Sequence, residues 1–207
     1  MKGLLRKLHA PVYRRRLEVL VDLLGNYLAE GEDLLDVGCG AGTLGEAVRK
    51  AHGITVTGLE TSVRDGCAIP VDPYDGETIP REDGSIDSVL LADVLHHEER
   101  PEQLLKEAAR VARKRVIVKD HKVGAFLAWP RISLIDWAAN AGYGVRCLFR
   151  YPSLDGWHTL FSDCGLHIEE ELGSIDLYPA GLNALFGRKL QYLAVLRRGD
   201  SQASADS

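Results

Sequence analysis

Short apolar runs alternate with segments of helical apolar spacing along most of the chain. Apolar residues recur every three or four positions over residues 17–28, which predicts a helix before the first strand. Runs bounded by turn residues predict strands at 34–37, 54–59, 67–71, 86–92 and 116–118, with helices at 44–51 and 101–112. Because strands alternate with helices, we expect a parallel sheet. Pro70 lies inside the third strand, so that strand is expected at the edge.

The second half of the chain departs from this alternation. Residues 122–148 are apolar, carry Trp129 and Trp137, and are long enough to form an inserted helical lid. Ordinary core packing is an equally good explanation for the two tryptophans. The later pattern predicts a helix at 155–164 and two strands, at 166–172 and 190–196, that are joined by an irregular loop.

Length and composition indicate one globular domain. The chain has 207 residues, of which 45% are hydrophobic and 27% charged, a balance typical of a protein that buries a core. We expect a single domain over residues 1–198, within which 1–30 form an N-terminal helical cap and 122–165 a helical substrate lid. Residues 199–207 are polar and are expected to be a flexible tail.

Charge and cysteine content narrow the partners and the compartment. A net charge of −5 provides no general attraction to phosphate backbones, so no nucleic-acid partner is expected. Four cysteines without a C-x-x-C pair favour reduced thiols and a cytoplasmic location. The chain contains no apolar run of about 20 residues, so no stable membrane insertion is expected. The basic run that ends at Arg16 is expected to cap a site, with contact to a membrane surface as the alternative, and the protein is expected to be a monomer or homodimer.

A glycine-rich turn follows the first strand. Gly38, Gly40 and Gly42 alternate with other residues between strand 34–37 and the next helix. Glycine permits positive φ and lets a ligand approach the backbone, and the helix that follows offers free N–H groups to an anionic part of that ligand. Three glycines at this spacing exceed what a tight turn without a ligand needs. The turn is therefore a candidate ligand-binding loop.

The same turn also satisfies a dinucleotide-binding pattern. Gly40, Gly42 and Gly45 form G-x-G-x-x-G, and Glu60 lies where such a fold places its ribose-binding acid. An NAD-dependent oxidoreductase is therefore one alternative. Against it, Asp36 lies in the strand end, so the full string is D-x-G-x-G-x-G.

This string resembles the first motif of a known family. LLDVGCGAG, residues 34–42, is similar to the motif of the class I, seven-stranded S-adenosylmethionine-dependent methyltransferases, particularly their small-molecule branch related to the ubiquinone and menaquinone biosynthesis enzymes. The resemblance extends from about Leu34 to His121. It implies an α/β, Rossmann-like doubly wound sheet, mostly parallel with an antiparallel last strand, in the order 3-2-1-4-5-7-6, with a helical insertion after strand 5.

The resemblance also implies a cofactor and an activity. S-adenosyl-L-methionine would donate a methyl group to a small-molecule acceptor, at an O, N or C atom that the sequence leaves open. Independently of the resemblance, the apolar and aromatic segment 122–148 would suit a hydrophobic or aromatic acceptor. A protein that binds this cofactor without turnover is a further alternative.

Individual cofactor contacts follow from the same resemblance. The acid at Asp36 would steady the loop and hold the amino group, Glu60 would bind the ribose hydroxyls, and Asp75 would bind the adenine amino group. Arg81 departs from the phenylalanine that is usual after the adenine motif. The cofactor-binding residues implied are Asp36, Gly38, Cys39, Gly40, Gly42, Glu60, Thr61, Asp75, Gly76, Ala92 and Asp93.

Three histidines are candidates for proton removal from the acceptor. Ligands of open α/β sheets bind beyond the carboxyl ends of the strands, where His96, His97 and His121 are expected. Histidine accepts a proton readily near neutral pH, so His121 is our first candidate base and His96 or His97 the second. The alternatives are that His97 caps a helix or packs against the cofactor, and that Lys119 and Asp120 form a solvated pair.

A metal ion is not expected in this cluster. Carboxylates and imidazoles converge at two strand ends, as in catechol-type relatives that hold magnesium. Magnesium, however, prefers oxygen ligands, and this cluster is rich in histidine.

Overall fold

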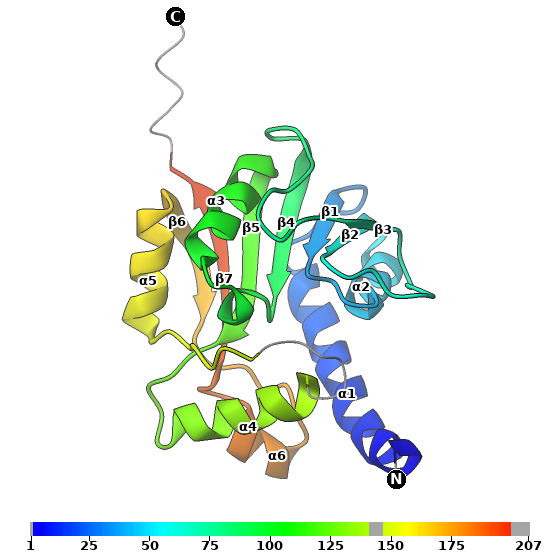
Figure 1. The fold of residues 1–207 in the computed structure, drawn as a ribbon, viewed down its shortest axis with the longest axis vertical. Coiled ribbons are helices and arrows are strands. Elements are labelled where there is room, and N and C mark those ends of the chain that lie inside the picture. Colours follow the sequence, from blue (N-terminus) through cyan, green and yellow to red (C-terminus); the bar gives the residue numbers. More distant parts are fainter. Residues whose placement is uncertain (1, 141–146, 200–207) are drawn as a thin grey trace, which may run out of the picture.

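The computed structural model describes residues 2–140 and 147–199, which form a seven-stranded sheet flanked by helices (Figure 1). The strands are β1 (Asp33–Val37), β2 (Thr55–Glu60), β3 (Val71–Pro73), β4 (Ile86–Ala92), β5 (Ala112–His121), β6 (Leu166–Leu172) and β7 (Gln191–Arg198). The helices are α1 (Lys2–Gly25), α2 (Thr43–His52), α3 (Pro101–Val111), α4 (Ala128–Asn140), α5 (Leu154–Asp163) and α6 (Ala180–Phe186), with a short 3-10 helix η1 (Leu95–His97).

The sheet topology confirms the predicted Rossmann-like architecture. The strand order is β3-β2-β1-β4-β5-β7-β6. Strands β1 to β5 pair in parallel, whereas β7 is antiparallel to both β5 and β6. The carboxyl ends of β1, β4 and β5 therefore lie at one edge of the sheet, the lower edge in Figure 1.

Alternating apolar side chains give the sheet two buried faces. Leu35 and Leu91 pack on the face that α3 and α5 cover. Their neighbours Leu34 and Leu90 pack on the opposite face with residues of α1 and α2. Because successive side chains of a strand point to opposite faces, a strand covered by helices on both sides is apolar at nearly every position. This explains the short continuous apolar runs in the sequence.

The third strand differs from its prediction. It occupies Val71–Pro73, at the expected sheet edge, and not residues 67–71. The Ala68 N–H donates to the Ala41 carbonyl and Ile69 packs into the core, so this stretch folds back on the glycine turn. Pro70 supplies only a carbonyl, which accepts from the Gly58 N–H. Pairing with β2 as a strand therefore begins after the proline.

The loop expected between the last two strands contains α6. Asn183 is buried within this short helix and bonds to Asp176 and to the Tyr178 N–H. Arg131 of α4 donates to the Leu185 carbonyl, so α6 lies against α4. Such tertiary contacts leave no periodic signal in a seven-residue helix, and sequence periodicity missed it for this reason.

The inserted segment divides into two unlike parts. Helix α5 packs on the sheet through Trp157 and Phe161, both fully buried. Helix α4 lies beyond the carboxyl edge of the sheet, beside α6 (Figure 1). There Trp129 and Trp137 are 53% and 58% exposed, so neither is core. Residues 141–146 of the expected lid and 200–207 of the expected tail lie outside the described residues.

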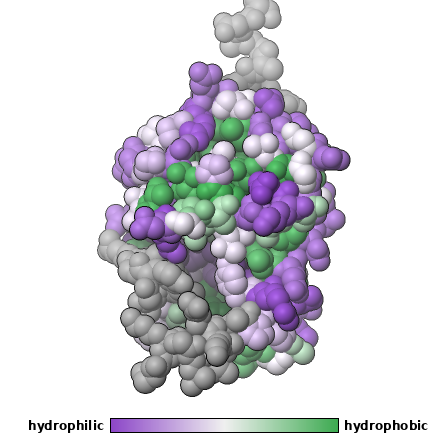
Figure 2. Space-filling model, turned by 90° about the vertical axis from the view of Figure 1, so that its right-hand side faces the viewer, coloured by the Kyte–Doolittle hydropathy of each residue, from purple (hydrophilic) through white to green (hydrophobic). Residues whose placement is uncertain are grey.

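The surface of the described chain mixes polar and apolar residues. Figure 2 shows the side that carries the β3 edge, with hydrophilic residues around its margins and hydrophobic residues in a band across its upper half. None of the described helices combines the length and apolarity needed to cross a membrane.

Candidate functional site

The glycine turn joins β1 to α2 with three left-handed residues. Gly38, Gly40 and Gly42 have φ values of 70°, 59° and 71°. A Cβ on Gly38 would lie 2.7 Å from Val94 Cγ2, and one on Gly42 would lie 2.4 Å from Ile69 Cγ1. A Cβ on Gly40 would meet nothing closer than 3.9 Å. Packing therefore requires glycine at the two outer positions, whereas Gly40 faces open space.

Glu60 ends β2 and holds the glycine turn. Its Oε2 accepts from the Gly40 N–H at 2.7 Å, and its Oε1 accepts from the Thr61 N–H at 3.0 Å. The adjacent parallel strands β1 and β2 bring the two segments together. The carboxylate therefore lies directly beside the open space at Gly40.

A pocket of about 890 Å³ opens over this turn, within the range of roughly 300–1,000 Å³ that is usual for ligand sites. Eight of the predicted cofactor residues line it: Asp36, Gly38, Cys39, Gly40, Glu60, Thr61, Ala92 and Asp93. Tyr13 and Arg16 of α1 line it too, as does His97 of η1. Gly42 is not among the lining residues and contributes through its packing on Ile69.

Asp36 is a buried acid beneath this pocket. It is 2% exposed, and burial together with the nearby negative charge of Glu60 raises its pKa to about 7. A buried carboxylate beside a second one is stabilised by a cation. The floor of the pocket is thus suited to a positively charged ligand.

The predicted adenine motif lies at the rim of the pocket. Asp75 Oδ1 accepts from the N–H groups of Glu77 and Thr78 at 2.8 and 2.7 Å, which makes it the cap of a surface turn. Neither Asp75 nor Gly76 is among the pocket-lining residues. A Cβ on Gly76 would lie 3.3 Å from Thr61 Cγ2, so the turn packs next to the pocket. The roles of both residues in adenine binding stay predictions.

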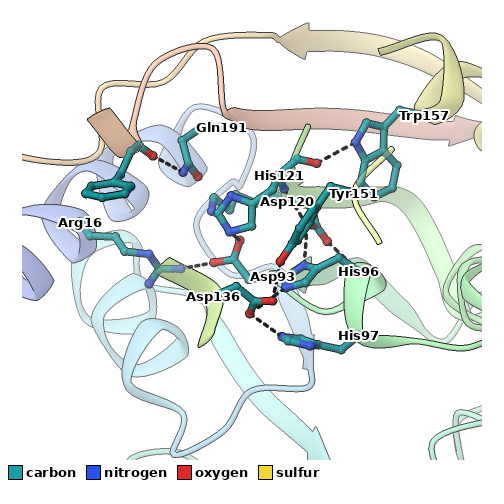
Figure 3. A network of polar contacts seen from close by, with 12 residues as sticks. Arg16, Asp93, His96, His97, Asp120, His121, Asp136, Tyr151, Trp157 and Gln191 are labelled. Atoms are coloured by element: carbon teal, nitrogen blue, oxygen red, sulfur yellow. Dashed lines mark hydrogen bonds and ion pairs between the residues drawn. The ribbon is translucent and has the colours of Figure 1, made fainter. Parts of the chain in front are cut away.

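Asp93 forms an ion-paired group between the pocket and the sheet. It follows β4 with a φ of 58° and pairs with Arg16 (Figure 3). It also accepts a hydrogen bond from Lys119 Nζ at 2.5 Å. Burial opposes its charge, but Lys119 and Arg16 outweigh that effect and hold the pKa of Asp93 well below its usual range. Lys119 is only 1% exposed and forms its ion pair with Asp93. The alternative of a solvated pair between Lys119 and Asp120 is therefore wrong.

His96 and His97 lie side by side on η1. His96 Nδ1 donates to Asp120 Oδ1 at 2.6 Å. The Nε2 atoms of both histidines lie 3.5 Å from Asp136 Oδ1, on α4. Although burial opposes protonation of His96, Asp120 and Asp136 raise its pKa to about 10. Tyr151 donates to the other oxygen of Asp136 at 2.7 Å.

His121, at the end of β5, lies behind this group. Its ring contacts those of His96 and Tyr151, and its carbonyl accepts from the Trp157 indole. Burial and the charge of Lys119 lower the pKa of His121 to about 4. It lines neither this pocket nor the second pocket described next, so its role as general base stays a prediction.

A second pocket of about 450 Å³ lies on the other side of η1. His96 and Glu98 line it, and Glu98 also lines the first pocket. The remaining lining is mainly apolar and aromatic: Leu95, Pro101, Trp129, Phe149, Tyr151, Pro152, Trp157 and Leu160, with Arg150.

Sequence reasoning missed Asp136 as a site residue. Asp136 is the only acid in the apolar segment AWPRISLIDWAAN of α4, and a lone acid in such a segment was the signal available. Its partners are His96 of η1 and Tyr151, which follows the undescribed residues 141–146. The spacing of residues along the sequence does not reveal that these segments meet.

Comparison with known proteins identifies part of the chain. A family described as a methyltransferase domain matches residues 35–118. An uncharacterised 37.1 kDa protein in a transposon of Streptomyces fradiae is 38% identical over 97 residues. That alignment spans 40% of this chain and only 28% of the relative.

Solved structures extend the similarity of fold to nearly the whole chain. An S-adenosylmethionine-dependent methyltransferase from Thermotoga maritima has a TM-score of 0.69 and 19% identity, covering 93% of this chain and 94% of its own. Another from Aquifex aeolicus has a TM-score of 0.62 and 19% identity, covering 95% and 97%.

The domain match implies S-adenosylmethionine as the cofactor, while the link to the quinone-biosynthesis branch stays a prediction. Residues 35–118 thus match a methyltransferase domain, and the described residues share the fold and strand order of solved S-adenosylmethionine-dependent methyltransferases.

Proposed function

We propose that this protein methylates a small molecule held in the second pocket, with the cofactor held in the first. The observation that carries this proposal is the pair of pockets, about 890 and 450 Å³, that meet at η1. His97 and Glu98 face the larger pocket, and His96 and Glu98 face the smaller one. A donor and an acceptor on either side of one short helix would be held close together, which removes much of the entropic cost of the reaction.

The cofactor, when bound, supplies an electrophilic methyl group on a positively charged sulfur. Gly40 leaves room for it, and the Glu60 carboxylate can accept hydrogen bonds from two ribose hydroxyls in a fork. The buried acid Asp36 favours the positive charge of such a ligand. The open space, the acid at its margin and the buried acid below it all fit S-adenosylmethionine.

The second pocket suits an apolar or aromatic acceptor. Trp129, Phe149 and Tyr151 supply aromatic walls, and Leu95 and Leu160 add aliphatic ones. In the proposed transfer, an electron pair of the acceptor forms the new bond to the methyl carbon, the electrons of the carbon–sulfur bond return to sulfur, and the acceptor loses a proton. His121 stays our predicted base for that proton: its buried Nδ1 has no hydrogen-bond partner among the described residues, although its side chain lines neither pocket.

Calorimetry with S-adenosylmethionine, its demethylated product and NAD tests the cofactor. We expect S-adenosylmethionine and its demethylated product to bind and NAD not to bind, and binding of NAD alone would favour an oxidoreductase.

Incubation with methyl-labelled cofactor and a panel of aromatic hydroxyl, amine and thiol compounds tests the acceptor. Label in small molecules is the expected result. Cofactor binding without labelled product from the panel and from cell extracts would favour a binding protein without turnover, and label in macromolecules alone would contradict the small-molecule proposal.

A further inference from the structure

We propose that His96, His97 and Asp136 form a binding site for a divalent first-row transition-metal ion, with zinc as the representative. Each residue offers one potential ligand atom, and all three atoms lie within 4.8 Å of one another. Figure 3 shows the Asp136 carboxylate directed toward the two imidazoles. The three residues come from η1 and α4, two elements far apart in the sequence.

The spacing of these atoms is that of metal ligands. Asp136 Oδ1 lies 3.5 Å from Nε2 of each histidine. Ligand atoms held at about 2.1 Å from one ion lie about 3.0 Å apart in an octahedron and about 3.4 Å apart in a tetrahedron. The two separations from Asp136 are close to the tetrahedral value, whereas hydrogen-bonded N and O atoms are usually about 2.9 Å apart.

The surrounding hydrogen bonds orient both kinds of ligand. Asp120 is fully buried and accepts from His96 Nδ1 at 2.6 Å, which leaves the lone pair of a neutral imidazole on Nε2. Tyr151 donates to Asp136 Oδ2 at 2.7 Å, which turns Oδ1 toward the histidines. A buried carboxylate that fixes the outer nitrogen of a histidine is the usual support of a metal-bound imidazole.

A protonated His96 between two carboxylates is the competing explanation. Such an imidazolium would donate a hydrogen bond from Nε2 as well as from Nδ1. His96 Nε2 is buried and has no hydrogen-bond partner among the described residues, although Asp136 Oδ1 is 3.5 Å away. The side chain of His96 is only 1% exposed, so no bulk water replaces that partner. This unsatisfied buried nitrogen, 3.5 Å from Asp136 Oδ1, favours the metal site, where the ion would displace the proton from Nε2.

The donor set decides which ions fit. Two imidazoles and one carboxylate suit zinc, cobalt, nickel or iron, whereas magnesium and calcium prefer oxygen ligands. No metal ion of any kind was predicted from the sequence; that prediction rested on the oxygen preference of magnesium and did not consider Asp136. Three protein ligands leave at least one coordination position open, as in catalytic zinc sites.

The position of the site connects it to the acceptor. His97 lines the first pocket and His96 the second, so an ion between them lies where the two pockets meet. An acceptor hydroxyl or thiol in the second pocket would then fill the open position, a consequence that rests on the proposed function. The metal site itself does not depend on it.

Metal binding is measured on the full chain after dialysis against a chelator. Titration with zinc in a calorimeter should give one ion per chain, and cobalt should give the visible absorption of a four- or five-coordinate ion. His97→Ala and Asp136→Asn should each weaken zinc binding by at least about 100-fold, more than the 10–100-fold typical for loss of an outer hydrogen-bonding partner. His158→Ala is the matched control, because His158 forms a histidine–carboxylate pair with Glu171 away from the site, and it should leave binding unchanged.

The result that overturns the proposal is wild-type protein that takes up less than about 0.1 equivalent of zinc, cobalt, nickel or iron at 100 µM free ion. Uptake that His97→Ala and Asp136→Asn leave unchanged would overturn it equally. If Asp136→Asn fails to fold, His97→Ala decides, because that side chain is 15% exposed and tolerates truncation better. Cofactor binding measured on the same samples separates this outcome from the proposed function: intact cofactor binding without metal uptake rejects the metal site alone.

Discussion

Alanine substitutions at Gly40 and Gly42 should separate cofactor binding from folding. Both residues have left-handed backbone, so alanine costs about 1–2 kcal/mol at either position. At Gly40 the added methyl group has free space, with its nearest neighbour at 3.9 Å. At Gly42 it would lie 2.4 Å from Ile69 Cγ1 and 3.3 Å from the Ile69 backbone nitrogen.

The two variants should therefore differ in stability by the cost of overpacking, about 1–3 kcal/mol. We expect Gly40→Ala to lower the free energy of unfolding by about 1–2 kcal/mol and Gly42→Ala by about 2–5 kcal/mol. The Gly40 methyl group enters the proposed cofactor space, so Gly40→Ala should also weaken S-adenosylmethionine binding at least about tenfold, or 1.4 kcal/mol.

Urea denaturation measures the free energies of unfolding, and calorimetry at a temperature where each variant is folded measures cofactor affinity. Wild-type affinity in Gly40→Ala would refute the position assigned to the cofactor. Equal destabilisation by the two substitutions would refute the packing argument for Gly42.

Three further predictions concern buried ionisable groups. In the protein without cofactor the pKa of Asp36 is about 7, and a cationic ligand favours its ionised form, so cofactor affinity should rise between pH 6 and 8 with release of a proton. Calorimetry should show that Asp36→Asn abolishes this rise. An unchanged pH dependence in the variant would contradict the role of Asp36. Lys119→Met removes one of the two cations paired with Asp93 and leaves Arg16, so it should lower the free energy of unfolding by about 2–3 kcal/mol, less than the loss of both cations would. Urea denaturation measures this free energy, and no loss of stability would count against the Lys119–Asp93 pair. His121→Ala should reduce the rate of methyl transfer by about 100-fold with cofactor affinity retained; a rate within a few-fold of wild type would exclude His121 as the base.

The sequence predicted the elements that local pattern determines. The apolar run at Leu34 and Leu35 predicts a strand that is buried on both faces of the sheet, and the glycines after it predict a tight turn of the backbone. The strand, the turn and the helix that follows could therefore all be predicted. From these, with the family resemblance, the strand order followed and is confirmed. Helix α6 could not be predicted, because its stability comes from contacts with α4 and from the buried Asn183.

The candidate site was predictable where it depends on strand ends. Glu60 ends β2 and Asp93 directly follows β4, so both reach the carboxyl edge of the sheet whatever covers it. Asp136 reaches the same place only because α4 folds back over η1, which is a tertiary arrangement. For the same reason the sequence could not show that His121 lies behind Tyr151 and outside both pockets.

The most direct test of the account is the affinity of Glu60→Gln for S-adenosylmethionine, measured by calorimetry beside Asp72→Asn. Glutamine keeps the shape of Glu60 but loses the charge and one of two acceptors, a loss of about 1.5–3 kcal/mol or roughly 10- to 150-fold in affinity. Asp72 is an exposed carboxylate paired with Arg81 outside the pocket, and its substitution should leave affinity unchanged. Equal affinity of Glu60→Gln and the wild-type protein, or no binding by the wild-type protein, would contradict the account.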